Sequence, residues 1–450
     1  MKQHSGASIG RTIIYTLFFF LLAAGFAGCS KSDSTPTPPP ETSGADASTY
    51  PADVLDKWMT LQLRLMRDAT GIPNVAFARY YVYSGIVAYE AVRPGIAKNP
   101  YNIPWNGLTG LPEIEAHKTY YWPASANAGL ASINKSIFTT ATTADKAAID
   151  SLEKAINSSF PTSDTAAVTR SNAFGNSIAS VVFSWSEADN YKNASAPYTL
   201  PVGPGSWVPT PPAFAAASTP YWGNIRTTID GSIANSQPAA PTPYSEDVNS
   251  AFYKMAKDLY DSSQTLTTEH KNQAIFWRDV PGVTSPGHWL SILQQVLAIT
   301  GSKFDKAASA YAITGACIND ALISCWQTKY KYNLVRPITL MQSAVFGHST
   351  WTAVLSTPAH PEYSSAHAVL SASGADALTF LFGSIGSFTD HTYDYFPQPS
   401  RTYASFKSIG EDAGYSRFYA GIHYMPTVLV GLTQGRTVAA NIISKIVSGK

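Results

Sequence analysis

Apolar residues that recur at helical spacing constrain this chain more than any other feature of its sequence. From residue 51 onward they return every three or four positions, as at Val54, Leu55, Trp58, Leu61 and Leu65. Such a repeat places apolar side chains along one face of an α-helix. Few segments show the alternation of apolar and polar residues that marks a half-buried strand. The sequence therefore predicts an all-α fold, built as a large helical bundle.

The helical pattern forms two halves around a proline-rich stretch. We expect further helices at residues 77–92, 128–158, 164–192, 246–259, 267–278, 287–299, 305–334, 366–382, 400–421 and 428–447. The stretch 193–245 carries ten of the 30 prolines together with several aromatic residues, and loops this long are usually functional or packed over a core. The expected organisation of residues 51–450 is one domain with an N-terminal helical half (51–192), this loop and a C-terminal helical half (246–450).

Charge is scarce in this sequence and nearly balanced. Charged residues make up only 14% of the chain, well below the usual quarter, while hydrophobic residues make up 45%. Lysine and arginine number 31 against 30 aspartates and glutamates, which gives a formal net charge of +1. A chain this balanced lacks the basic surface that nucleic-acid binding requires, so we expect no nucleic-acid partner. Any anion site must be local and built from a few placed cations.

The N-terminus has the pattern of a targeting segment. Its apolar run, 13–27, is about 15 residues long, which is short for a membrane span but typical of a signal-peptide core. The run ends in small residues followed by Cys29, which resembles a bacterial lipobox and implies a signal peptide over 1–28 and a lipid on Cys29. A flexible tether rich in serine, threonine and proline follows over 29–50. The alternatives are an ordinary signal peptide cut nearby and an uncleaved anchor.

This pattern also predicts where the protein resides. We expect attachment to the membrane by the lipid anchor only, since removal of 1–28 leaves a nearly neutral chain with no basic attraction to lipid. The expected location is the bacterial cell envelope, as an outer-membrane lipoprotein that faces the periplasm or the cell surface.

Common metal and disulfide motifs are missing from the sequence. There is no HExxH, CxxC or EF-hand pattern, so we infer no zinc or calcium site. Cys317 and Cys325 are eight residues apart in a helical stretch, roughly 12 Å along the axis, which is too far for a disulfide. We expect both to be buried thiols, and we expect His288 and His348 to be structural or at the rim of a site.

Lys329 and Arg336 lie seven residues apart in a basic segment with helical character. Two helical turns bring such side chains to within about 20° of the same face, and Pro337 should end the helix near Arg336. Two cations on one face repel each other unless they share an anion. The alternative is a solvated basic face that also includes Lys331.

A second segment places serines and a histidine at the start of an expected helix. Pro361 disfavours helix before it, so Ser364 or Ser365 should be the N-cap of the helix that contains His367. A helix N-terminus offers unpaired N–H groups, and together with a hydroxyl and a histidine these form an anion site. The alternative is a capped helix with a surface histidine.

A third segment contains Ser416-Arg417 followed by Gly421 and His423. It supplies another cation and another histidine near a glycine that allows a helix to end or bend. Together, the three segments offer a lysine, two arginines, a serine, helix N–H groups and histidines. This set fits a tetrahedral oxyanion, because cations neutralise it, guanidinium forks match its oxygens, and a histidine can attack or coordinate its central atom.

In chain order, Lys-x6-Arg-Pro, Ser-x-His at a helix start and Ser-Arg-x3-Gly-x-His resemble the vanadium-dependent haloperoxidases and the type 2 phosphatidic acid phosphatase superfamily. These signatures span 326–423, and the phrases at 77–92, 204–212 and 276–289 are similar to haloperoxidase-like bacterial proteins. The resemblance covers most of residues 51–450. It implies a haloperoxidase-like helical domain with the oxyanion site at the core of the C-terminal helices.

The resemblance also assigns roles to the matching positions of this chain. It implies vanadate as the cofactor, hydrogen peroxide and halide as the substrates, and hypohalous acid as the product. His423 would bond vanadium, and His367 would be the acid–base group that faces it. The residues implied to hold the vanadate oxygens are Lys329, Arg336, Ser365, Ala366 and Arg417. The family often forms homodimers.

Two further positions bear on the halide. Family chloroperoxidases have a Phe seven residues before the acid–base histidine and bromoperoxidases have a His, and here that position is His360. Trp326, three residues before Lys329, matches an aromatic position of the halide pocket. The resemblance therefore implies bromide or iodide rather than chloride.

One departure leaves other functions open. The family has an Asp four residues after its last histidine, whereas this chain has Thr427, so His423 must be oriented by a carbonyl, by Thr427 or not at all. The first alternative is an acid phosphatase in which His423 is the nucleophile and His367 the leaving-group acid. The second is a catalytically decayed lipoprotein that only binds an oxyanion or a partner.

Overall fold

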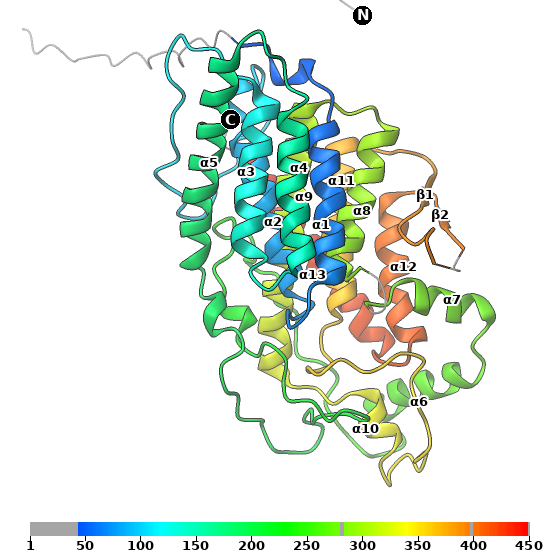
Figure 1. Cartoon of the computed structure of the whole chain (residues 1–450). Helices are drawn as coiled ribbons and strands as arrows, with labels where there is room; N and C mark the ends of the chain where they lie inside the picture. The colour runs from blue at the N-terminus through cyan, green and yellow to red at the C-terminus, as the bar shows by residue number, and fades with distance from the viewer. Residues whose placement is uncertain (1–43, 280–282, 397–398, 449–450) are drawn as a thin grey trace, which may run out of the picture. The chain divides into compact units, whose positions relative to one another are not determined.

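The computed structural model describes residues 44–279, 283–396 and 399–448 of the chain (Figure 1). Within these ranges the protein is helical, with thirteen α-helices and only two short strands, and the predicted all-α fold is confirmed. All of these described residues belong to one compact unit. The expected signal peptide, Cys29 and most of the expected tether lie outside the described residues.

Most helices and strands follow one another with short connections, and the long ones lie between α2 and α3, between α5 and α6, and between α10 and α11. The N-terminal helices are α1 (Asp53–Asp68), α2 (Ala76–Glu90), α3 (Trp122–Ile137), α4 (Thr143–Asn157) and α5 (Thr165–Glu187). The C-terminal helices are α6 (Ala251–Gln264), α7 (Thr268–Phe276), α8 (Ser285–Ile299), α9 (Phe304–Tyr332), α10 (Pro337–Met341), α11 (Ala366–Phe382), α12 (Phe406–Tyr419) and α13 (Met425–Ser448). Four single 3-10 turns lie at η1 (Ala47–Thr49), η2 (Arg93–Gly95), η3 (Tyr191–Asn193) and η4 (Trp222–Asn224).

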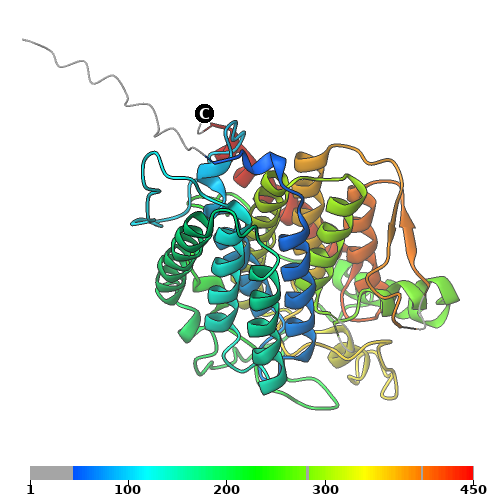
Figure 2. The same cartoon turned by 45° about the horizontal axis from the view of Figure 1, so that its top comes forward.

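One antiparallel hairpin interrupts the helical pattern. Its strands, β1 (Phe388–Asp390) and β2 (Arg401–Tyr403), pair with Asp390 opposite Arg401. Both views place the hairpin beside α12 (Figures 1 and 2). The predicted helix over 400–421 is therefore wrong at its start. Ser405 begins α12 with a capping box to Ser408, which fixes the helix start after the strand.

Helix α9 forms the centre of the core, and α2, α11 and α13 pack around it. Every residue of α2 is buried. Two glycines allow α2 and α9 to approach closely: a Cβ on Gly85 would lie 2.7 Å from the Tyr311 carbonyl oxygen, and one on Gly315 would lie 2.9 Å from the Val82 Cα. This tight contact gives α9 a rigid setting, and α9 carries Trp326 and Lys329 near its C-terminal end.

The predicted single helix over 128–158 is wrong, because the chain breaks between α3 and α4. Thr142 caps α4, since its hydroxyl accepts a hydrogen bond from the Asp145 N–H (3.1 Å) and donates one to the Asp145 carboxylate (2.7 Å). The apolar periodicity continues across this break because both helices cover the same core. Periodicity alone therefore did not reveal the cap.

The expectation that Lys329 and Arg336 share one helical face is also wrong. Helix α9 ends at Tyr332, and Asn333 adopts the left-handed conformation (φ 47°) that ends helices. Arg336 is extended and precedes α10, whose first residue is Pro337. Proline disfavours helix at the residue before it and suits the first position of a new helix, so Pro337 starts α10 rather than ending α9.

The proline-rich loop is packed over α9 by a buried carboxylate. Asp320 of α9 accepts hydrogen bonds from the Thr228 N–H (2.8 Å), the Thr228 hydroxyl (2.9 Å), the Ile229 N–H (3.2 Å) and the Ser232 hydroxyl (2.8 Å). Burial raises the pKa of Asp320, and these donors oppose that shift. Because these donors come from one short segment, a single side chain fixes residues 228–232 of the loop on the core.

The two cysteines and the histidines at 288 and 348 follow the expectations from the sequence. Cys317 and Cys325 are buried free thiols. His288 is buried and His348 stacks on Tyr260 with ring centroids 3.7 Å apart. Among the helices of the described ranges, none has both the length and the apolar character needed to cross a membrane.

We expect Asp320→Ala to destabilise the fold strongly, because it leaves at least three donors buried without an acceptor. The free energy of unfolding, measured by denaturant titration, should fall by about 3 kcal/mol or more. Asp258→Ala removes an exposed carboxylate and serves as the control. A loss for Asp320→Ala no larger than that of the control would show that the loop does not depend on this carboxylate.

Candidate active site

The three sequence segments meet at one cavity of about 560 Å³. Its wall includes the proposed site residues Trp326, His360, Ala366, His367, Arg417 and His423. Lys329, Arg336 and Ser365 are completely buried next to this wall. The structure thus brings together residues that are up to about a hundred positions apart in the sequence, on α9, α11, α12 and the segments between them.

A buried glutamate fixes the orientation of His423. The His423 Nδ1 lies 2.9 Å from Glu362 Oε1, which also accepts the Tyr424 N–H at 3.0 Å. On the opposite side of the ring, Nε2 lies 3.1 Å from Arg336 Nη1, and an arginine can only donate. His423 therefore carries its hydrogen on Nδ1, donated to the carboxylate, and leaves Nε2 unprotonated.

The electrostatic surroundings keep His423 neutral. Its pKa is held well below the usual value, first by burial and then by the charges of Arg336, Lys329 and Arg417. An imidazole that is neutral, oriented and unprotonated on Nε2 is the form that bonds a metal centre.

Glu362 supplies the carboxylate that is missing four residues after His423. None of the three arrangements expected for His423 is correct: the orienting group is neither a carbonyl nor Thr427 itself. The Thr427 hydroxyl instead donates to Glu362 Oε2 at 3.0 Å and helps to hold the carboxylate. Burial raises the pKa of Glu362 to about 7, opposed by the nearby charges of Arg336 and Lys329. A lone acidic residue within the segment 357–367, which otherwise carries histidines and serines, is the signal that could have identified it.

Lys329 donates only to main-chain carbonyls of that same segment. Its Nζ lies 2.9 Å from the Pro361 oxygen, 3.2 Å from the Glu362 oxygen and 2.6 Å from the Ser364 oxygen. Burial lowers the pKa of Lys329 to about 7, and the charge of Arg336 acts in the same direction. Lys329 thus holds the backbone that carries Glu362 and the start of α11.

The two arginines reach the cavity from different parts of the fold, Arg336 from the segment between α9 and α10 and Arg417 from α12. Arg336 donates from Nε to the His360 carbonyl (2.8 Å) and from Nη1 to the Ile422 carbonyl (2.9 Å). Arg417 donates from Nη1 to the Trp277 carbonyl at 3.0 Å. Burial lowers the pKa of each arginine to about 10, so both guanidinium groups stay charged at neutral pH.

Two polar atoms of the proposed site residues are buried without a protein partner within the described residues. They are the Ser365 hydroxyl and the Arg417 Nε–H. Ser365 is the N-cap of α11, as one of the two residues expected, but its side chain makes no capping bond. The free N–H groups of the first α11 turn, including that of Ala366, lie beside it. Three buried cations, an unpaired hydroxyl and a helix N-terminus fit a tetrahedral oxyanion such as vanadate.

His367 is held by a chain of polar groups that the sequence did not suggest. Its Nε2 lies 3.0 Å from the Trp277 carbonyl and 2.7 Å from the Ser285 hydroxyl, which in turn donates to Asp279 at 2.9 Å. Because a carbonyl only accepts, Nε2 carries the hydrogen and Nδ1 is left available to a ligand. Burial lowers the pKa of His367 to about 3, strengthened by Arg417 and opposed by Asp279. Asp279 and Ser285 lie in the segment 276–289, which resembles haloperoxidase-like bacterial proteins, but that resemblance assigned no role to either residue.

Trp326 and His360 form a pair of rings at the cavity wall, with centroids 5.1 Å apart. The Trp326 Nε1–H is engaged by the Thr219 hydroxyl at 3.0 Å, so the indole presents its ring rather than its N–H. His360 Nδ1 faces the Arg336 Nη2 donor at 3.0 Å and the Pro361 carbonyl at 3.3 Å. Because the closer, charged group can only donate, Nδ1 accepts from it and the hydrogen lies on Nε2. The pKa of His360 is well below its usual value because of burial and the charges of Lys329 and Arg336.

Comparison with known proteins identifies the family. Residues 309–448 match the family described as the VCPO second helical-bundle domain. The solved structure of a bacterial vanadium-dependent iodoperoxidase is 32% identical in sequence, with a TM-score of 0.79 over 88% of this chain and 97% of that chain. No curated protein matches the chain in sequence.

More distant structures share the fold. The apo form of a bacterial vanadium-dependent chloroperoxidase is 15% identical, with a TM-score of 0.64 over 84% of this chain and 94% of that chain. Its holo form is also 15% identical, with a TM-score of 0.62 over 83% and 92%.

Fold and site define a helical enzyme with a buried oxyanion site. The identity to the iodoperoxidase over most of both chains shows that this chain belongs to the vanadium-dependent haloperoxidases, whose cofactor is vanadate. The predicted family, enzyme class and cofactor are confirmed.

We expect Glu362→Gln to weaken vanadate binding by about 10- to 100-fold, because the neutral amide no longer fixes the hydrogen of His423 on Nδ1. Calorimetric titration of the apoprotein with vanadate measures this directly. Thr427→Val removes one hydrogen bond to the carboxylate but leaves its charge, so it should lose less than about tenfold. Unchanged affinity in folded Glu362→Gln protein would show that Glu362 does not orient His423.

Proposed function

We propose that this protein oxidises iodide or bromide with hydrogen peroxide to hypohalous acid. The observation that carries the proposal is His423, neutral and fixed by Glu362 with an unprotonated Nε2, among three buried cations. This arrangement suits the bonding of a vanadium centre and the neutralisation of its oxygens.

Each site residue has a role that follows from its contacts. His423 would bond vanadium through Nε2. Bound vanadate supplies a Lewis acid that activates hydrogen peroxide toward attack by halide. The groups proposed to hold the vanadate oxygens are the side chains of Lys329, Arg336, Ser365 and Arg417 and the N–H of Ala366. Because all three Lys329 donors already bond carbonyls, Lys329 would act on the oxyanion chiefly through its charge.

His367 is proposed to move the protons of the reaction. Its Nε2–H is held by the Trp277 carbonyl and the Ser285 hydroxyl, which fixes the ring and leaves Nδ1 to exchange a proton. The depressed pKa of His367 keeps Nδ1 unprotonated at neutral pH, so it is ready to accept a proton from hydrogen peroxide. The negative charge of a bound oxyanion would raise this pKa and allow the proton to be returned to the leaving oxygen.

The halide preference rests on the cavity wall. His360 presents an Nε2–H donor and Trp326 presents an aromatic face, which suit a large, weakly hydrated anion. Chloride holds its water more strongly and is harder to oxidise than bromide or iodide. The named activity of the 32% identical relative, an iodoperoxidase, supports the same preference.

We expect peroxide turnover by the purified protein to require both vanadate and halide, in the order iodide, bromide, chloride. His423→Ala should abolish vanadate binding, whereas His367→Ala should keep binding but lower kcat by about 10² to 10⁴-fold. Triiodide or tribromide absorbance measures the rate. Release of phosphate from a monoester, inhibited by vanadate and without halide oxidation, would support the phosphatase alternative instead.

We further propose that the mature protein is held at the bacterial cell envelope by a lipid on Cys29, on the side of the periplasm or the cell surface. The proposal is supported by the lipobox-like end of the apolar run and by the tether that follows it. Expressed in a Gram-negative host, the full chain should partition into detergent and Cys29→Ser should not. Equal partition of both chains would contradict the lipid anchor.

A further inference from the structure

One main-chain carbonyl connects two of the groups proposed to act in catalysis. The Trp277 carbonyl, directly after α7, accepts from Arg417 Nη1 and from His367 Nε2, each at 3.0 Å. Arg417 belongs to α12 and His367 to α11. The position of this oxygen therefore affects where the remaining guanidinium N–H groups point and, together with the Ser285 hydroxyl, how the His367 ring is oriented.

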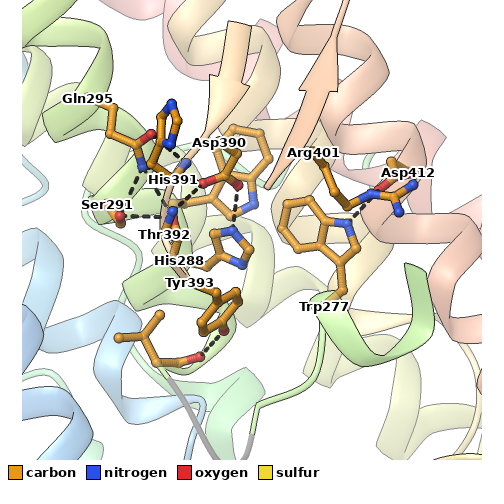
Figure 3. A network of polar contacts seen from close by, with 12 residues as sticks. Trp277, His288, Ser291, Gln295, Asp390, His391, Thr392, Tyr393, Arg401 and Asp412 are labelled. Carbon is orange, nitrogen blue, oxygen red and sulfur yellow. Dashed lines mark hydrogen bonds and ion pairs between the residues drawn. The ribbon is translucent and has the colours of Figure 1, made fainter. Parts of the chain in front are cut away.

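The Trp277 side chain is held on two sides by what we call the indole clamp, His288 and Asp412 (Figure 3). The indole Nε1–H donates to Asp412 Oδ2 at 2.7 Å. The His288 ring stacks on the indole with centroids 4.3 Å apart and an interplanar angle of 23°. Trp277 is 1% exposed, so its ring cannot turn without breaking both contacts.

The β1–β2 hairpin holds both members of the clamp. Asp390 of β1 bonds His288 Nε2 at 2.7 Å, and Arg401 of β2 bonds Asp412 through Nη2 at 3.0 Å and Nε at 3.1 Å. Burial alone would raise the pKa of Asp390, but His288 and the Thr392 hydrogen bonds lower it, so the carboxylate is ionised. Because Asp390 and Arg401 are opposite each other in the hairpin register, one small element fixes two sides of the same indole.

These polar groups take no direct part in the site. Neither member of the clamp, nor either hairpin residue, belongs to the described wall of the cavity. Ion pairs add little net stability whether they are exposed or buried, because screening or desolvation offsets most of their attraction, and the best-supported benefit of buried ones is a fixed geometry. The indole clamp therefore needs an explanation other than stability.

We propose that the indole clamp and the β1–β2 hairpin are a positioning device, which fixes the Trp277 carbonyl and thereby orients Arg417 and His367 for the oxyanion. The inference rests on the proposed function through the roles of these two residues. With Nη1 committed to the carbonyl, Arg417 keeps its unpaired Nε–H for the oxyanion. A guanidinium group binds an oxyanion well only in a narrow range of orientations. A shift of the Trp277 carbonyl should therefore weaken oxyanion binding by Arg417.

Trp277→Phe tests the proposal, because it keeps an aromatic ring against His288 but removes the bond to Asp412. It should raise the Kd of the apoprotein for vanadate by about tenfold. Trp58→Phe is the matched control. Trp58 lies in α1, is also 1% exposed, and donates its Nε1–H to Asn127 at 2.9 Å. Both variants should lower the melting temperature by a similar amount, but only Trp277→Phe should weaken the binding of vanadate.

A second pair of variants compares a conservative and a non-conservative change at Asp412. Asp412→Asn retains an oxygen that accepts the indole N–H and should weaken vanadate binding by less than about threefold, whereas Asp412→Leu should match Trp277→Phe. In the vanadate-free protein, Trp277→Phe should also shift the ¹⁵N resonance of His367 Nε2, and Trp58→Phe should not. Both readouts are made without halide or peroxide, so they decide this inference whether or not the proposed reaction occurs. Folded Trp277→Phe protein with unchanged vanadate affinity and an unchanged His367 resonance would overturn it.

Discussion

The burial of three cations around one cavity is the constraint on which the rest of the C-terminal half depends. Lys329, Arg336 and Arg417 are at most 3% exposed, and removing such charges from water costs several kcal/mol each unless other groups solvate them. Main-chain carbonyls take most of that role here, from residues 277, 360, 361, 362, 364 and 422. The carbonyl dipoles solvate these positive charges but do not neutralise them, whereas a bound oxyanion would. The site therefore suits a multiply charged anion.

Lys329 and Arg336 also hold the backbone segment that carries Glu362, the buried carboxylate near them. Lys329 holds the carbonyls of Pro361, Glu362 and Ser364, and Arg336 holds that of His360, so the backbone between His360 and Ser365 is fixed by the charges it solvates. This placement turns the Glu362 side chain toward His423. A carboxylate can therefore orient His423 from a different element than α13, where the family has its aspartate, and Thr427 is left to hold the carboxylate.

The sequence predicted the parts of the site that have fixed spacing or a helix start, and it missed those that depend on the tertiary fold. The cations and histidines were found because three short patterns supplied complementary chemistry. The shared helical face of Lys329 and Arg336 was wrong, since Asn333 ends α9 before Arg336. Glu362 left a single signal, as the lone acidic residue of 357–367, and the roles of Asp279, Ser285 and the Trp277 carbonyl left none. The contacts that Glu362 and Trp277 make with His423, His367 and Arg417 join residues 61 to 140 positions apart, and a main-chain oxygen leaves no trace in a sequence. The all-α fold was predictable because its apolar period is local.

The N-terminal half contributes to this chemistry by excluding charge rather than supplying it. Of its residues in the described part of the chain, only Ile72, Pro73, Asn74 and Val75 line the cavity, and none of them ionises. Helix α2, completely buried, packs closely on α9 through Gly85 and Gly315, so this side of α9 faces protein rather than solvent. In such a low-dielectric setting a fixed cation acts more strongly on an anion than it would in water. The scarcity of charged residues in the chain as a whole is therefore part of how three of them act at one place.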